Sequence, residues 1–225
     1  MYCNNCEAER PDSHRYCFVC GGALQEDKSN ENLWAVVDFV SRGHSDQNLA
    51  ALRQFADQHL DNSYAQKILG NVLFHKGSLV EAESRYRMAI EIEPENIELI
   101  YDLSIVLYYQ TRLSEAATYL EKLLALNPEY SAAHYRVGLT YYHLGRYDEA
   151  AEHFKKCTLL TPDYIMAHYH LGVVYSKMGK LEEAIDEFNH QLDKNLKDSA
   201  SRHHLEELFV RRWKKEADQN ARSTG

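Results

Sequence analysis

The sequence has no long hydrophobic run, and it has fewer basic than acidic side chains. No apolar stretch approaches the roughly 18 residues that suggest a membrane span. The first six residues, Met1 to Cys6, lack the basic and apolar regions of a secretory signal. The 225 residues carry a formal net charge of −9, and an acidic surface repels phosphate backbones. We therefore expect a cytoplasmic protein for which general nucleic-acid binding is disfavoured.

Motifs of catalysis are also missing. The sequence contains no phosphate-binding glycine loop, no Gly-x-Ser-x-Gly turn and no metal site with an open coordination position. These absences predict a protein that is not an enzyme.

Proline and cysteine are scarce, and their positions are informative. Three of the four prolines are spaced by 34 residues, and four of the five cysteines fall within the first 20 residues. Other residues share the period of 34. The columns are Ala82, Ala116, Ala150, Ala184; Pro94, Pro128, Pro162; Gly70, Gly138, Gly172; Gly77, Gly145, Gly179; and Tyr86, Leu120, Phe154, Phe188.

These columns resemble the tetratricopeptide repeat family, whose order of Leu-Gly, Tyr, Gly, Ala, aromatic, Ala and Pro is visible in residues 137–162 and 171–188. The resemblance covers about residues 63–198. It implies an all-α solenoid of antiparallel helix pairs, with repeats at 63–96, 97–130, 131–164 and 165–198. A degenerate helix pair at 29–62, with helices near 31–42 and 46–59, would cap the N-terminal side. A helix at 199–216, with Leu205 and Phe209 in the expected columns, would cap the other side, followed by a frayed tail.

The repeated residues have physical roles in such a helix pair. Small residues allow two helices to cross closely, a second glycine allows a left-handed turn between helices, and proline ends the second helix. One repeat cannot bury its own apolar face, so neighbouring repeats must stack. The second repeat departs from the pattern at Ser104 and Thr111, which stand where the two glycines are expected.

The N-terminal cysteines form two Cys-x2-Cys pairs, at Cys3 and Cys6 and at Cys17 and Cys20. Four thiolates in this spacing can hold one metal ion tetrahedrally. Residues 1–24 also resemble short zinc ribbons, with an aromatic residue before Cys17 and glycine after Cys20. We expect one structural Zn²⁺ ion; iron in the same cage, or two disulfides in an exported protein, are the alternatives.

The family resemblance also implies a partner-binding surface on the concave side, lined by the first helix of each repeat. The second, fifth, ninth and twelfth positions of the repeats would point into this groove. The fifth and twelfth are mostly tyrosine, which combines apolar area with a hydroxyl group. An alternative is that some of these rings only pack between repeats. The predicted contact residues are Lys67, Asn71, Phe74, Tyr101, Tyr108, Tyr135, Arg136, Tyr142 and Tyr169.

Some members of the family bind the C-terminal carboxylate of chaperone tails. Lys67, Asn71 and Arg136 match the residues that such members use, but Asp102 and Ala132 replace an Asn and a Lys of the set. A carboxylate beside Asp102 would meet like charge, so this specific ligand is disfavoured.

The remaining reactive residues have simple interpretations. We expect packing or surface roles for His134, His168, His170, His203 and His204, and a buried core position for Cys157. The cluster Arg211, Arg212, Lys214 and Lys215 around Trp213 is typical of a solvated helix end, with docking of an acidic partner or a membrane surface as the alternative.

The sequence therefore predicts a protein–protein interaction scaffold that binds a peptide or helical segment. The alternative function is nucleic-acid contact through the zinc ribbon. The oligomeric state is left open.

Overall fold

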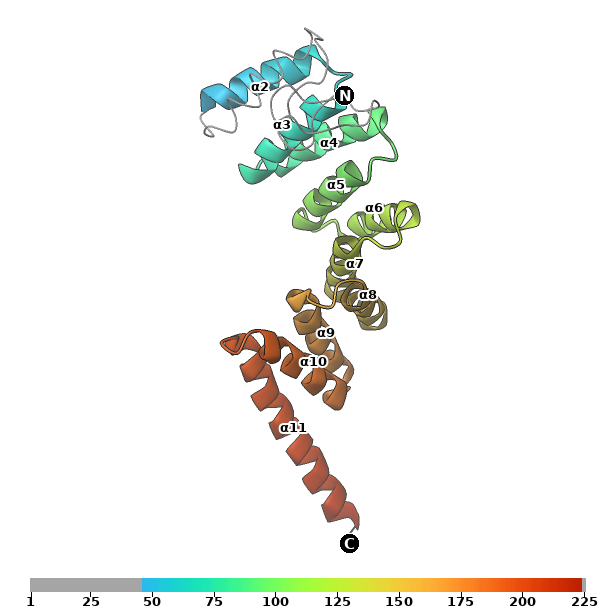
Figure 1. Cartoon of the computed structure of the whole chain (residues 1–225), viewed down its shortest axis with the longest axis vertical. Coiled ribbons are helices and arrows are strands. Elements are labelled where there is room, and N and C mark those ends of the chain that lie inside the picture. Colours follow the sequence, from blue (N-terminus) through green and yellow to red (C-terminus); the bar gives the residue numbers. More distant parts are fainter. Residues whose placement is uncertain (1–45, 224–225) are drawn as a thin grey trace, which may run out of the picture. The chain divides into compact units, whose positions relative to one another are not determined.

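The computed structural model describes residues 46–223, and the side chains of residues 49–219 (Figure 1). This part is formed by ten helices and contains no strand, which confirms the all-α prediction. The predicted zinc ribbon and the predicted helix at 31–42 lie outside the described residues. The helices are α2 (Asp46–Gln58), α3 (Ser63–His75), α4 (Leu79–Ile92), α5 (Ile97–Tyr109), α6 (Leu113–Leu126), α7 (Ser131–His143), α8 (Tyr147–Leu160), α9 (Ile165–Met178), α10 (Leu181–Lys194) and α11 (Ser199–Ser223).

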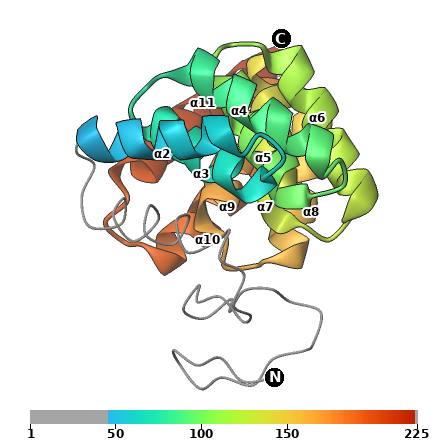
Figure 2. The ribbon, with the colours of Figure 1, turned by 90° about the horizontal axis from the view of Figure 1, so that it is seen from above.

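The chain divides into two compact units, residues 1–99 (unit 1) and 100–225 (unit 2). In unit 1, α3 packs against both α2 and α4. In unit 2, each helix from α6 to α11 packs against the next one along the chain. Seen from above, α7 and α9 lie on one side of unit 2 and α6 and α8 on the other (Figure 2). We call α3, α5, α7, α9 and α11 the A helices, and α4, α6, α8 and α10 the B helices.

A glycine in an A helix lets the aromatic ring of its B helix approach the backbone. A Cβ atom at Gly138 would lie 2.8 Å from ring carbons of Phe154, and one at Gly172 would lie 3.0 Å from the ring of Phe188. These distances are shorter than van der Waals contact, so a side chain there would displace the ring. Glycine therefore recurs every 34 residues because an aromatic ring of the B helix recurs opposite it with the same spacing.

The second repeat carries a different pair of residues at the equivalent positions. Ser104 stands in the glycine column, and Leu120 stands where Phe154 and Phe188 stand in later repeats. Both side chains are buried, and the Ser104 hydroxyl donates a hydrogen bond of 2.6 Å to the carbonyl of Tyr101. A leucine is smaller than a phenylalanine, which leaves room for a serine, and the hydroxyl has a partner.

The turn between the helices of a pair requires a left-handed residue. Gly77, Gly145 and Gly179 have φ angles of 79°, 75° and 76°, and Thr111 has a φ of 62° at the same position. The amide of Arg112 donates to the carbonyl of Leu107 at 2.9 Å, which matches the helix-ending bonds of the glycine turns. Thr111 therefore adopts a glycine conformation despite its branched side chain.

The last helix differs from the sequence prediction. Helix α11 runs to Ser223 and is therefore longer than the predicted helix at 199–216. Leu205 is buried as expected, but Phe209 is 43% exposed. In earlier repeats the equivalent Tyr141 and Tyr175 are buried, whereas no B helix follows α11 in the part of the chain described here. Phe209 therefore lacks the helix that would cover it.

Cys157 occupies the core position that the sequence predicts. Its side chain is fully buried in α8, and burial raises the pKa of the thiol to about 11. The thiol is therefore protonated at neutral pH and is a poor nucleophile.

Candidate partner-binding surface

The A helices of unit 2 are joined by contacts between residues 35 positions apart. Arg136 Nε donates to the Tyr101 hydroxyl at 3.4 Å, and the rings of Tyr135 and His170 lie 5.7 Å apart. The same relation links Tyr169 to His204, whose Nε2 lies 3.2 Å from the tyrosine hydroxyl. We call the surface that carries these residues the A-helix face of unit 2. It holds the predicted contact residues Tyr101, Tyr108, Tyr135, Arg136, Tyr142 and Tyr169.

These tyrosines are not equally available to a partner. Tyr135 is only 9% exposed, and the centroid of its ring lies 5.8 Å from that of Phe154 and 4.9 Å from that of Tyr164. Burial, and then the proximity of Tyr164, raise the pKa of Tyr135 to about 12. The other predicted tyrosines of this face are partly exposed. Tyr135 thus fits the alternative of packing between repeats, whereas the others leave surface for a ligand.

Two further tyrosines of this face were missed by the sequence analysis. Tyr130 and Tyr164 precede α7 and α9, at the column where Asn62 and Asp198 cap α3 and α11 with their side chains. Neither tyrosine makes a side-chain cap. Instead, the ring of Tyr130 packs edge-to-face on Tyr101 at 5.7 Å. The break in the Asn/Asp column was the signal that could have identified them.

Arg136 is the cation at the centre of these rings. Arg136 is partly exposed as a residue, and the one hydrogen bond of its guanidinium among the described residues is the contact with Tyr101. Tyr108, Tyr109 and Tyr164 lie close enough to interact with its charge. No carboxylate of the described residues forms an ion pair with Arg136. A partly buried cation surrounded by phenols is suited to bind an anionic group of a ligand.

A second aromatic group lies at the C-terminal ends of the A helices. The ring of Tyr108 meets that of His143 at 5.7 Å, and Tyr142 meets Tyr147 at 5.9 Å. Tyr101 and Tyr108 are seven positions apart on α5, which corresponds to about 10 Å along the helix axis. The A-helix face therefore carries aromatic side chains over more than one turn, as a ligand lying across the helices would require.

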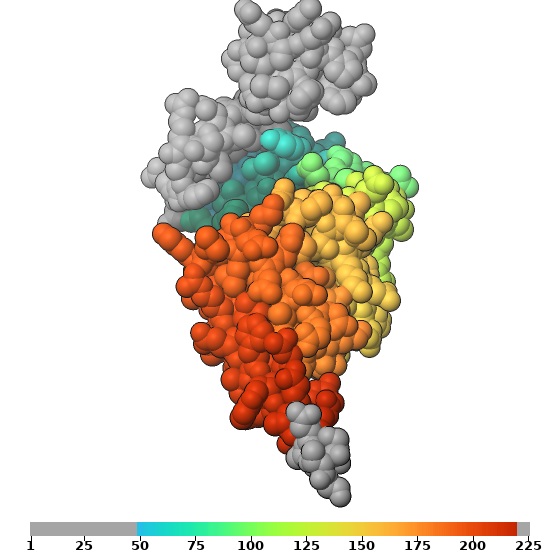
Figure 3. Space-filling model, turned by 60° about the horizontal axis from the view of Figure 1, so that its bottom comes forward, coloured from blue at the N-terminus to red at the C-terminus, as the bar shows by residue number. Residues whose placement is uncertain are grey.

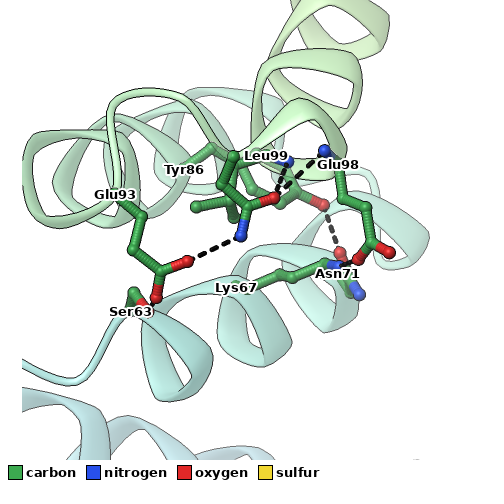
Figure 4. Close-up of polar contacts among 8 residues, drawn as sticks. Ser63, Lys67, Asn71, Tyr86, Glu93, Glu98 and Leu99 are labelled. Atoms are coloured by element: carbon green, nitrogen blue, oxygen red, sulfur yellow. Dashed lines mark hydrogen bonds and ion pairs between the residues drawn. The ribbon is translucent and has the colours of Figure 1, made fainter. Parts of the chain in front are cut away.

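The predicted contacts in unit 1 already have internal partners (Figure 4). The Lys67 ammonium forms an ion pair with the carboxylate of Glu98, and the Asn71 carbonyl oxygen accepts a hydrogen bond of 2.6 Å from the Tyr86 hydroxyl. Phe74 is partly exposed. A carboxylate ligand at Lys67 would have to compete with Glu98, which adds to the sequence argument against a chaperone-tail site.

The histidines have the packing roles that the sequence analysis expects. His134 and His168 each place Nε2 near the carbonyl oxygen of the proline that precedes their helix, at 3.0 and 3.1 Å. The ring of His170 stacks on Phe154 at 5.7 Å. No group of three metal-ligating side chains occurs in the part of the chain that the structure describes.

The basic cluster of α11 is mostly solvent-exposed. Trp213 is 68% exposed, and Arg212 forms ion pairs with Glu182 at 3.3 Å and Glu216 at 3.8 Å. Within residues 46–223, no helix combines the length and the apolar character needed to cross a membrane.

Comparison with known proteins identifies the class of the fold. A tetratricopeptide repeat profile matches residues 35–97 and 101–158, and related profiles match residues 138–179 and 167–193. The chain therefore belongs to the tetratricopeptide repeat family. No curated protein matches it.

Solved structures support the same fold. YrrB, described as a TPR protein with an unusual peptide-binding site, is 26% identical over 76% of this chain and 86% of its own, with a TM-score of 0.65. MamA from Desulfovibrio magneticus RS-1 is 22% identical over 77% of this chain and 98% of its own, with a TM-score of 0.70. A tetratricopeptide repeat protein from Parabacteroides merdae is 22% identical over 87% of this chain and 76% of its own, with a TM-score of 0.72.

Proposed function

We propose that the protein is an interaction scaffold whose A-helix face in unit 2 forms a concave groove for a peptide or helical segment of a partner protein. The observation that carries this proposal is Arg136, a partly buried cation without a carboxylate partner among the described residues, surrounded by tyrosines. Tyrosine and arginine are the residue types that most often dominate binding energy at interfaces. The similarity to YrrB, a TPR protein with a peptide-binding site, supports the same function for this chain.

The bound segment would carry an acidic group that meets Arg136. Apolar or aromatic side chains beside this group would rest on Tyr101, Tyr108 and Tyr142. Unit 1, taken by itself, carries Lys67, Asn71 and Phe74 in the corresponding columns. We propose Phe74 as its main partner contact because Lys67 is neutralised by Glu98.

The test compares captured partners from a native cell extract by quantitative mass spectrometry. The baits are the wild type, a face variant with Arg136→Gln and Tyr142→Ala, and a matched control with Lys156→Gln and Leu159→Ala. The control removes the same charge and a large exposed side chain from α8, where Leu159 is 77% exposed. Tyr135 is left intact because its burial would confound binding with folding.

We expect the wild type and the control to retain a partner that the face variant loses by tenfold or more, about 1.4 kcal/mol. The affinity of the segment mapped from that partner should fall by a similar factor in calorimetry. Equal capture by all three folded baits would refute the proposed surface. A salt-dependent mobility shift with RNA would instead favour the nucleic-acid alternative.

We also propose that residues 1–24 bind one structural Zn²⁺ ion through Cys3, Cys6, Cys17 and Cys20. The donor set supports this proposal, because four cysteines in two Cys-x2-Cys pairs fill the tetrahedral shell that zinc prefers. These residues lie outside the described part of the chain. A closed shell of four protein ligands leaves no position for a substrate, so the ion would stabilise the fold.

A further inference from the structure

A cavity of about 670 Å³ opens between α9 and α11 in unit 2. Its lining includes Val173 and Ser176 from α9, and His203, His204, Val210 and Arg211 from α11. In Figure 3 the orange and red surface belongs to the C-terminal helices that include α11. The volume lies within the range of about 300 to 1,000 Å³ that is typical of ligand pockets.

The cavity lies where the tyrosine columns of the A-helix face end. Ser176 occupies the column of Tyr108 and Tyr142, and His203 occupies the column of Tyr135 and Tyr169. Both replacements are smaller than tyrosine. Between α5 and α7, Tyr108 packs on His143 at 5.7 Å, whereas between α9 and α11 the equivalent contact is only a hydrogen bond of 3.2 Å from Arg211 to the Ser176 hydroxyl. The missing rings leave the space open.

The cavity has an aromatic floor that is held in place. The imidazole of His204 stacks on Phe188, with centroids 5.0 Å apart and an interplanar angle of 11°. The Tyr169 hydroxyl contacts His204 Nε2 at 3.2 Å, which fixes the plane of the ring. The side chain of His204 is still 31% exposed, and it lines the cavity. An aromatic ring entering the cavity can stack on this imidazole.

The rim of the cavity carries both signs of charge. Lys177 and Arg211 are basic, and Glu206 and Glu207 are acidic. Glu207 is near His203, at 3.5 Å. The rim therefore has no net charge to attract an ion of one sign, and a charged occupant would meet like charge on one side. The apolar walls of Val173 and Val210 favour a neutral occupant.

From these features we propose that the cavity is an anchor pocket for one neutral aromatic side chain, Trp or Tyr, of the partner segment. This inference rests on the proposed function of the A-helix face and adds a specificity determinant to it. The bound segment would lie along the tyrosines and Arg136, and its aromatic residue would replace the rings that the columns lack at Ser176 and His203.

The pocket can be tested without the natural partner. The probes are N-acetyl-tryptophanamide and N-acetyl-tyrosinamide, with N-acetyl-leucinamide as the aliphatic comparison, each titrated into the full methyl-labelled chain and followed by NMR at Val173 and Val210. Ser176→Tyr restores the column residue and fills the cavity, and Val210→Glu places a charge in its wall. Ser84→Tyr makes the same serine-to-tyrosine change on the exposed side of α4 and serves as the control.

We expect the two aromatic amides to shift both methyl signals in the wild type and in Ser84→Tyr. In Ser176→Tyr and Val210→Glu their binding, followed at Val173, should weaken by about tenfold or more. The proposal is wrong if the leucine amide shifts the signals as strongly, if no probe shifts them, or if neither pocket variant matters. It is also wrong if the signals already depend on protein concentration and Trp213→Ala removes that dependence, because the occupant is then a second copy of the chain.

These results separate the pocket from the proposed function. Loss of the partner in the Arg136→Gln and Tyr142→Ala variant, together with no probe binding, would leave the scaffold proposal standing and refute the pocket. Probe binding at Val173, together with unchanged partner capture by that variant, would support the pocket and refute the proposed groove.

Discussion

Replacing Thr111 by glycine should stabilise unit 2, although it removes a side chain. Thr111 has a φ of 62°, a left-handed conformation that costs a residue with a side chain about 1–2 kcal/mol. Glycine relieves this cost but loses about 0.5–1 kcal/mol through its greater freedom in the unfolded chain. The expected net gain is about 0.5–1 kcal/mol, which corresponds to roughly 1–4 °C in Tm for a chain of this size.

The reverse change provides a matched test. A Cβ atom at Gly145 would meet no atom within 4 Å, so Gly145→Thr adds backbone strain without a clash and should destabilise unit 2 by about 1 kcal/mol. Thr118→Gly, in the exposed middle of α6, controls for the loss of a threonine and should also destabilise, by about 0.3 kcal/mol. Urea unfolding followed by circular dichroism measures all three variants. If Thr111→Gly is neutral or as harmful as Thr118→Gly, the turn does not store the strain that its φ angle implies.

Further predictions concern the helix crossing, acid stability and the metal. Gly138→Ala should destabilise by about 1–3 kcal/mol in thermal unfolding, because the new Cβ would lie 2.8 Å from the Phe154 ring; an unchanged Tm would contradict the close approach. Burial lowers the pKa values of His153 and His170 to about 4, so the unfolded chain binds more protons between pH 6.5 and 4, and stability should fall by roughly 1–3 kcal/mol as the pH drops through this window. Replacing both residues with glutamine should flatten the dependence of Tm on pH, and an equally steep profile would rule out these two histidines as its source. Chelation should release one Zn²⁺ per chain and unfold residues 1–24 while the far-ultraviolet helix signal persists; loss of helix across the chain would overturn the modular organisation.

The period of 34 residues predicted the helix pairs well because each repeated residue is needed for packing or for a turn within its own helix pair. A glycine facing a ring, as Gly138 faces Phe154, leaves a mark in the sequence that is independent of what lies elsewhere. The departures at Ser104 and Thr111 were also tolerated in the way their size and turn position suggest. These features depend on contacts within one helix pair.

The candidate site was predicted less completely because it depends on contacts between pairs. Tyr135 was expected to face a ligand, but the neighbouring Tyr164 and His170 bury it. Tyr164 itself was missed because it stands outside the helices, in a column where Asn62 and Asp198 cap the helix that follows. Helix α11 continued further than expected, and no period could reveal the exposure of Phe209, which results from the absence of a following B helix in the described residues.

Because Cys157 is buried, the reactivity of its thiol reports how often the third repeat opens. The thiol is fully covered and its pKa is raised to about 11, so a thiol-specific reagent can modify it only when α8 separates from its neighbours. The modification rate, followed at this residue by mass spectrometry, therefore gives the free energy of local opening in the middle of unit 2. Because repeat arrays can fray from their ends before they unfold as a whole, comparing that free energy with global unfolding would show whether the repeats of unit 2 act cooperatively or open one by one.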